Sequence, residues 1–145
     1  MSTGRVHTRA TIYAAPCVTG AALLLVDLPT AALAGLGCLA GIVLSPDLDQ
    51  EGVSRTEWRI IRATFGVGWL WLVLSWPYAR LLPHRSIWSH APLLGTAGRV
   101  AYFGSLVAAA LWLAGVTVYQ EDVMWLVPFA AGLAVSDTLH WLMDL

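Results

Sequence analysis

Long apolar blocks without a single charged residue constrain the fold of this chain more than any other feature. Such blocks cover residues 10–26, 28–46, 63–79 and 100–120. Hydrophobic residues make up 58% of the chain and charged residues only 12%, and a soluble core of this size has no room for so many apolar side chains. The sequence therefore predicts an all-α integral membrane protein, with residues 1–145 forming a single helical membrane domain.

The apolar blocks predict two helix hairpins, and hence a polytopic membrane protein with about four transmembrane helices. In each hairpin a short polar turn separates two stretches that are long enough to be membrane helices. The first hairpin comprises a helix over about 11–26, a turn at 27–29 and a second helix that runs to Ser45 and is ended by Pro46; the second comprises helices over about 100–118 and 123–141, joined by the acidic turn 120–122.

The remaining apolar stretch, residues 63–79, decides the topology. Its tryptophans, glycines and proline allow an interfacial or re-entrant segment, although its length also permits a fifth transmembrane helix. If it does not cross, all the arginines share one face with both termini, and the positive-inside rule makes that face cytoplasmic. We therefore expect a multi-pass protein of the inner or plasma membrane, in contact with membrane lipids. These arginines are Arg5, Arg9, Arg55, Arg59, Arg62, Arg80, Arg85 and Arg99.

The distribution of charge argues against two classes of function. The formal net charge is −1 and there is no lysine, so the basic surface typical of nucleic-acid-binding proteins is missing from the sequence. A transporter needs a polar path across the bilayer, but the first two predicted helices carry no charged residue at their centres.

Two pairs of polar residues near the ends of the apolar blocks have the chemistry of metal ligands. Asp47 and Asp49 flank one residue in the motif PDLD, so both carboxylates can point the same way in an extended chain. Asp137 and His140 are three residues apart on a predicted helix and therefore share a face. This second pair could supply two ligands, or one ligand and the carboxylate that orients it.

The motif HRSIWSH adds two further imidazoles. His84 and His90 are six residues apart, so a loop must bring them together, and Arg85 between them offers a forked donor for an anionic group. His7 directly precedes the first predicted helix. Under the four-helix topology all these groups lie on one side of the membrane. Imidazole and carboxylate ligands together suit a divalent metal ion such as zinc, manganese or iron.

Each motif also has an ordinary structural explanation. PDLD is a common way to end a helix with a solvated turn. HRSIWSH can be an interfacial loop in which serines cap helices and Arg85 reaches lipid phosphates. Asp144 and the acidic turn at 120–122 are expected to be solvated.

The segments GRVHTR, PDLD and WPYARLLPHRSIWSH, followed by a late D-x-x-H, resemble an uncharacterised bacterial family of metal-binding proteins. That family is similar in its motif pattern to membrane-bound metal-dependent hydrolases. The resemblance spans nearly the whole chain. It implies a metal site that draws on His7, Asp47, Asp49, His84, His90, Asp137 and His140.

These observations predict a metal-dependent hydrolase with a cytoplasm-facing site at the membrane interface. The metal would activate water, Asp49 would act as general base, and Arg85 would hold a phosphate or carboxylate of the substrate. The location favours a lipid or lipid-linked substrate. The alternative is a non-catalytic membrane protein in which the metal stabilises the packing of the helices.

Overall fold

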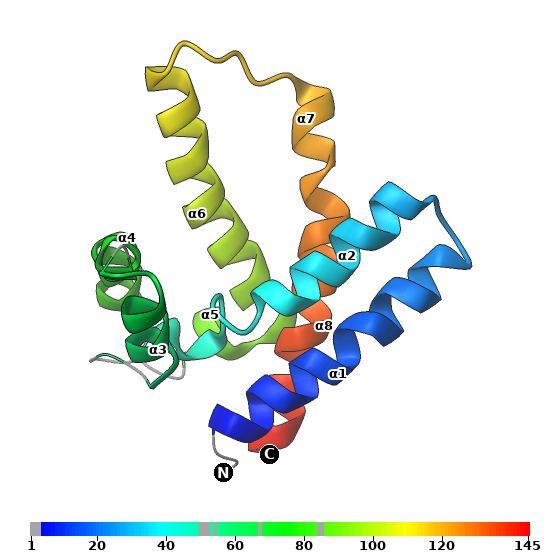
Figure 1. Ribbon diagram of the computed structural model, residues 1–145, viewed down its shortest axis with the longest axis horizontal. Coiled ribbons are helices and arrows are strands. Elements are labelled where there is room, and N and C mark those ends of the chain that lie inside the picture. Colours follow the sequence, from blue (N-terminus) through cyan, green and yellow to red (C-terminus); the bar gives the residue numbers. More distant parts are fainter. Residues whose placement is uncertain (1–3, 50–52, 54, 67, 84–85) are drawn as a thin grey trace.

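The computed structural model describes residues 4–49, 53, 55–66, 68–83 and 86–145, and helices dominate this part of the chain (Figure 1). All-α secondary structure is thus as predicted. The elements in chain order are α1 (Gly4–Leu23), α2 (Leu28–Ala40), the short 3-10 helix η1 (Pro46–Asp49), α3 (Arg55–Ala63), α4 (Gly68–Leu81), α5 (Ile87–His90), α6 (Pro92–Leu113), α7 (Gln120–Met124) and α8 (Leu126–Asp144).

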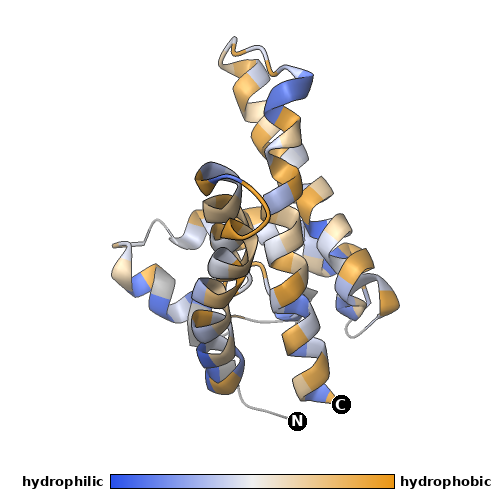
Figure 2. Cartoon of the chain, turned by 90° about the vertical axis from the view of Figure 1, so that its right-hand side faces the viewer, coloured by the Kyte–Doolittle hydropathy of each residue, from blue (hydrophilic) through white to orange (hydrophobic). Residues whose placement is uncertain are grey.

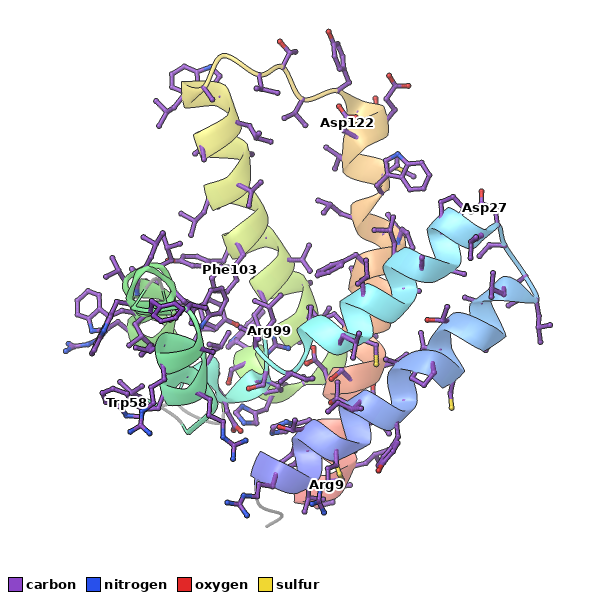
Figure 3. All side chains as sticks on the ribbon, viewed as in Figure 1. Arg9, Asp27, Trp58, Arg99, Phe103 and Asp122 are labelled. Atoms are coloured by element: carbon purple, nitrogen blue, oxygen red, sulfur yellow. The ribbon has the colours of Figure 1, made fainter. Side chains whose placement is uncertain are left out.

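The first two helices form an antiparallel pair with the predicted turn at Asp27. The Asp27 carboxylate accepts a hydrogen bond from the backbone N–H of Thr30 at 2.9 Å, and a proline in the first turn of α2 fits a helix start. Figure 3 shows Asp27 at the tip of this pair. The first helix begins at Gly4, earlier than predicted, so it includes His7 and the charged residues around it.

The last helix, α8, is the element on which the others assemble. It contacts α1, α2, α6 and α7, and its contact with α2 is the most extensive in the molecule. Glycines permit this contact: a Cβ on Gly37 would lie 1.9 Å from the carbonyl oxygen of Phe129, and one on Gly132 would lie 1.8 Å from that of Ala34. The two backbones touch directly, and the buried residues around them are mostly small.

Two long arms project from this helical base. One arm is α6, and the other consists of α7 and the part of α8 that continues in line with it (Figure 1). Residues 114–119 connect the two arms at their far end. Figure 2 shows hydrophobic ribbon along much of the arms and a hydrophilic segment at the far end of α7. Both chain termini lie at the opposite end of the molecule from this connection.

The prediction of about four transmembrane helices in two hairpins is wrong. Among the described residues, two helical stretches have the length and apolar composition to cross a membrane, Pro92–Leu113 and Gln120–Asp144. The first predicted hairpin fails because α1 includes polar and charged residues near its start, while α2 has only 13 residues. At 1.5 Å per residue, α2 is about 20 Å long, which is less than the hydrocarbon thickness of about 30 Å.

Among the described residues of the apolar stretch 63–79, no helix is long and apolar enough to span a membrane, so a fifth transmembrane helix is not found there. The stretch contributes the end of α3 and most of α4, which has 14 residues. The helix packs against α3 and η1, and its buried Tyr78 meets Tyr102 of α6 with ring centroids 5.4 Å apart. Aromatic contacts therefore attach α4 to the side of α6.

The glycine contact between α2 and α8 can be tested by adding one methyl group. We expect Gly37→Ala to lower the free energy of unfolding by about 1–3 kcal/mol, because the new Cβ must displace the backbone at Phe129. Gly20→Ala in α1 is the matched control, since a Cβ there meets nothing within 4 Å. Helix propensity should leave that variant unchanged or stabilise it by up to about 1 kcal/mol. Thermal and denaturant unfolding followed by circular dichroism would measure both, and equal effects would contradict the close contact.

Candidate metal site

Two imidazoles and a carboxylate converge where the start of α1 meets the end of α8. His7 Nε2 lies 3.3 Å from Asp144 Oδ1, and His140 Nε2 lies 3.4 Å from Asp144 Oδ2. One ligand atom from each of the three residues can be chosen so that all lie within 4.8 Å of one another. Each imidazole thus points its Nε2 atom toward the carboxylate of Asp144.

Helical spacing and one hydrogen bond between helices place these groups. His140 and Asp144 are four residues apart on α8 and lie on one face. One turn after His7, the hydroxyl of Thr11 lies 3.1 Å from that of Ser136, which is one turn before His140. This buried contact fixes the register between α1 and α8, and so it sets the two histidines level with each other.

The two imidazoles lie against each other in a largely buried environment. Their rings stack with centroids 3.9 Å apart and planes 14° apart. Burial lowers the pKa of His7, and the neighbouring His140 lowers it further, although Asp144 and Asp47 act in the opposite direction. Among the described residues, the buried Nε2 of His140 makes no hydrogen bond even though two carboxylates lie close to it. A buried ring nitrogen without a hydrogen-bond partner offers a position that a metal ion can occupy.

A second carboxylate borders the cluster. Asp47 stands in η1, directly after Pro46, and its Oδ2 lies 3.6 Å from His140 Nε2. About a third of the Asp47 side chain is exposed, whereas the His140 side chain is almost fully buried. Asp47 therefore links the ligand cluster to solvent.

Asp137 belongs to a different network, beside the cluster. Its Oδ2 accepts hydrogen bonds from the Arg99 guanidinium and from the Thr96 hydroxyl, both on α6. Arg99 and Asp137 are 0% and 1% exposed, so they form a fully buried ion pair. The sequence analysis places Arg99 with the arginines on the cytoplasmic face, but the structure buries it inside the helical base (Figure 3). The Asp137 carboxylate compensates the buried charge.

His90, at the end of α5, lies close to the cluster. Its ring centroid is 6.4 Å from that of His140, and the two rings are nearly perpendicular. The Nδ1 atom of His90 lies 3.0 Å from the hydroxyl of Ser89, which is completely buried.

The structure thus brings His7, Asp47 and His140 from the predicted set into one cluster, with His90 next to it and Asp137 paired elsewhere. The remaining predicted residues are not placed: His84 and Arg85 lie outside the described residues, as does the side chain of Asp49.

Sequence reasoning overlooked Asp144, and it did not assign Arg99, Thr96 or Ser89 to a site. Asp144 was expected to be solvated, yet it contacts both imidazoles. A signal for it is present, because Asp144 follows His140 by four residues and helical spacing puts both on one face. No comparable signal marks Arg99, whose partner is 38 residues away in the chain.

The chain matches the model of a protein family described as "Uncharacterized metal-binding protein (DUF2227)" over residues 2–129. It belongs to this family. The metal-binding part of the predicted resemblance is therefore confirmed. The matched range contains His7, Asp47 and His90, while His140 and Asp144 follow it along the chain. Neither the comparison with curated proteins nor that with solved structures gives a match.

Proposed function

We propose that this family member binds a divalent metal ion through His7, His140 and Asp144 and hydrolyses its substrate at that site. The observation that carries this proposal is the spacing of the three groups, 3.3 and 3.4 Å from each imidazole nitrogen to the shared carboxylate. One ligand atom from each of the three residues lies within 4.8 Å of the others, and imidazole nitrogen with carboxylate oxygen suits zinc, manganese or iron. Zinc is the first of these to test.

A set of two histidines and one carboxylate is also typical of catalytic zinc, which binds water beside its protein ligands and can expand its coordination to five. A metal ion bound by these residues would supply Lewis acidity and lower the pKa of its water. Asp47 is suited to accept a proton there, because its carboxylate borders His140 and reaches solvent. We assign to Asp47 the general-base role that the sequence analysis gives to Asp49.

A structural metal site is the second candidate function. It is favoured by the origin of the ligands, since His7 comes from α1 and the other two from α8. An ion held by both helices would join them whether or not any substrate reacted. The two candidate functions predict different effects of removing the Asp47 carboxylate. Only a hydrolase would lose reaction rate, while a structural site would keep its metal and its stability.

We also propose that α6 and the α7–α8 arm anchor the protein in a membrane as one helical hairpin. The structure exposes 9265 Å², whereas a compact monomer of 15.6 kDa exposes about 7,200 Å². Large apolar side chains contribute to this excess on both arms, for example Trp112, Leu113 and Met124, all more than 60% exposed. Insertion of the arms would cover these side chains with lipid.

The charges support an orientation for this hairpin. The connection between the arms, residues 114–119, carries no charged residue, and the acidic pair Glu121 and Asp122 follows it directly. In the sequence every arginine comes before α6 or within its first eight residues, and none follows in the rest of α6, the connection or the second arm. By the positive-inside rule this distribution favours a cytoplasmic location, near the lipid headgroups, for the termini and the proposed metal site. That position favours a lipid or lipid-linked substrate.

Metal content tests the ligand assignment. We expect the purified protein to bind one zinc ion per chain after reconstitution, and His140→Ala to lose it while remaining folded. Asp122→Ala, which removes an exposed acid at the far end of the molecule, should retain the zinc. Elemental mass spectrometry and circular dichroism would provide the two readouts. A wild type that takes up neither zinc, manganese nor iron would refute the metal site.

Asp47→Asn separates hydrolysis from a structural role. If Asp47 is the general base, this variant should keep its zinc and its melting temperature but hydrolyse p-nitrophenyl phosphate or p-nitrophenyl acetate about 10²–10⁴-fold more slowly. Initial rates would be measured on zinc-loaded protein. Equal rates in wild type and variant would contradict the assignment of Asp47. If the wild type shows no hydrolysis but melts at a lower temperature after chelation, the structural candidate is favoured.

Fractionation tests the hairpin. The wild type should remain in the membrane pellet after an alkaline carbonate wash and be released by detergent. Val107→Arg within α6 should reduce the retained fraction, because an arginine inside a membrane helix costs up to about 2.5–3.5 kcal/mol. Leu24→Arg adds the same charge at an exposed site between α1 and α2 and should behave as the wild type. Complete release of the wild type by carbonate would contradict membrane insertion.

A further inference from the structure

A buried polar network joins α5, α6 and α8 beside the proposed metal site. At its centre the guanidinium of Arg99 donates one hydrogen bond to Asp137 of α8. Another of its nitrogens, Nη1, donates to the backbone carbonyl of Ser89 in α5 at 3.4 Å. Arg99, Asp137 and Ser89 are all at most 1% exposed. The network therefore fixes the position of Ser89 relative to α8, the helix that carries His140 and Asp144.

Gly95 allows this network to form. A Cβ at this position would lie 2.3 Å from the carbonyl oxygen of Ser89 and 3.4 Å from Nη2 of Arg99. Only a glycine lets the start of α6 approach the Ser89 backbone so closely. The carbonyl is thus held between a close helix on one side and a fixed cation on the other.

The hydroxyl of Ser89 has a complete set of hydrogen-bond partners. It donates its single hydrogen to the carbonyl oxygen of Ser86 at 3.0 Å, an atom that can only accept. Its two lone pairs face Ser86 Oγ at 3.1 Å and His90 Nδ1 at 3.0 Å. With its hydrogen directed to the Ser86 carbonyl, Ser89 accepts a hydrogen bond from His90, and we therefore assign the proton of His90 to Nδ1.

This assignment determines the chemistry of the other ring nitrogen. In a neutral imidazole one nitrogen bears the proton and the other the lone pair, so the lone pair of His90 is on Nε2. That atom is buried, and its ring lies against the ring of His140. Metal-binding histidines commonly have their second nitrogen fixed by a hydrogen bond of this kind.

We propose that Ser89 is a positioning residue, which holds His90 in the tautomer with a basic Nε2 so that His90 can act as a further nitrogen ligand of the metal ion. Arg99 and Asp137 act indirectly, because the hydrogen bond from Arg99 to the Ser89 carbonyl fixes the Ser89 backbone. Asp137 is therefore not a ligand, and it contributes to the site by holding Arg99 in place. The inference rests on the proposed metal site, but its structural basis, the tautomer of His90, is independent of any metal.

Nitrogen NMR of the metal-free wild type tests the tautomer directly. With ¹⁵N-labelled histidine, and with His90→Asn to identify the resonances, we expect the proton of His90 on Nδ1. Ser89→Ala should shift this population toward the Nε2–H form. Ser75→Ala is the matched control, because it removes a buried serine on α4 whose hydroxyl likewise donates to a backbone carbonyl, that of Leu72. A wild type with the proton on Nε2 would overturn the proposal without the need for any variant.

Zinc affinity, measured by competition with a chromophoric chelator, tests the consequence. Loss of an orienting partner typically weakens metal binding about 10–100-fold, which is the decrease expected for Ser89→Ala, whereas Ser75→Ala should keep the wild-type affinity. Equal affinities in Ser89→Ala and wild type would refute the positioning role while leaving the metal site intact. A wild type that binds no zinc would refute the metal site, and with it the ligand role of His90. If Ser89→Ala does not fold, the tautomer of His90 in the metal-free wild type still decides the proposal.

Discussion

The direct contact between the backbones of α2 and α8 is the constraint on which the rest of the structure depends. Gly37 and Gly132 leave no space between the two helices, and small residues surround them. A contact of this kind gains its stability from close packing, which does not require large buried hydrophobic side chains. It holds α8 firmly in the helical base, and α8 carries His140, Asp144 and Asp137.

The buried ion pair of Arg99 and Asp137 fixes α6 in the same base. Two charges in a dry interior are costly unless each satisfies the other, so the pair tolerates little displacement of either helix. The long apolar arms diverge from this base (Figure 1). The candidate ligands His7, His140 and Asp144 lie where the start of α1 meets the end of α8. Polar contacts thus define the end of the molecule where chemistry is expected, and apolar surface defines the other end.

The sequence predicted those parts of the structure that depend on short-range patterns. Helical content and the turn at Asp27 follow from composition and capping chemistry. The expectation that His7, Asp47 and His140 lie together came instead from the family resemblance. The number of spanning helices could not be predicted from the apolar blocks, because the bounds of a block do not fix the residues at which a helix begins and ends. Helix α1 begins within the polar segment that precedes its block, and α2 ends after 13 residues.

The partners of individual side chains were harder to predict, for a related reason. Asp137 and His140 share a helix face, so the sequence alone does not tell which of them is available to a metal ion. In the structure Asp137 pairs with Arg99 of α6, a residue 38 positions away in the chain, and local patterns do not indicate such a partner. Asp144 was overlooked because position near a chain end is typical of a solvated acid. Its role depends on α1 packing against α8, a tertiary contact that no local pattern indicates.

The origin of the candidate ligands in α1 and α8 has a consequence for how the protein matures. An ion held by His7 and His140 closes a loop of 133 residues (140 minus 7), which includes nearly the whole chain. The entropy lost in closing a flexible loop rises slowly with its length, so a cross-link between such distant residues restricts the unfolded chain strongly. Because synthesis proceeds from the N-terminus, His7 emerges from the ribosome long before His140 and Asp144. A metal site made of these residues would therefore be completed only after α6 and the second arm have been synthesised.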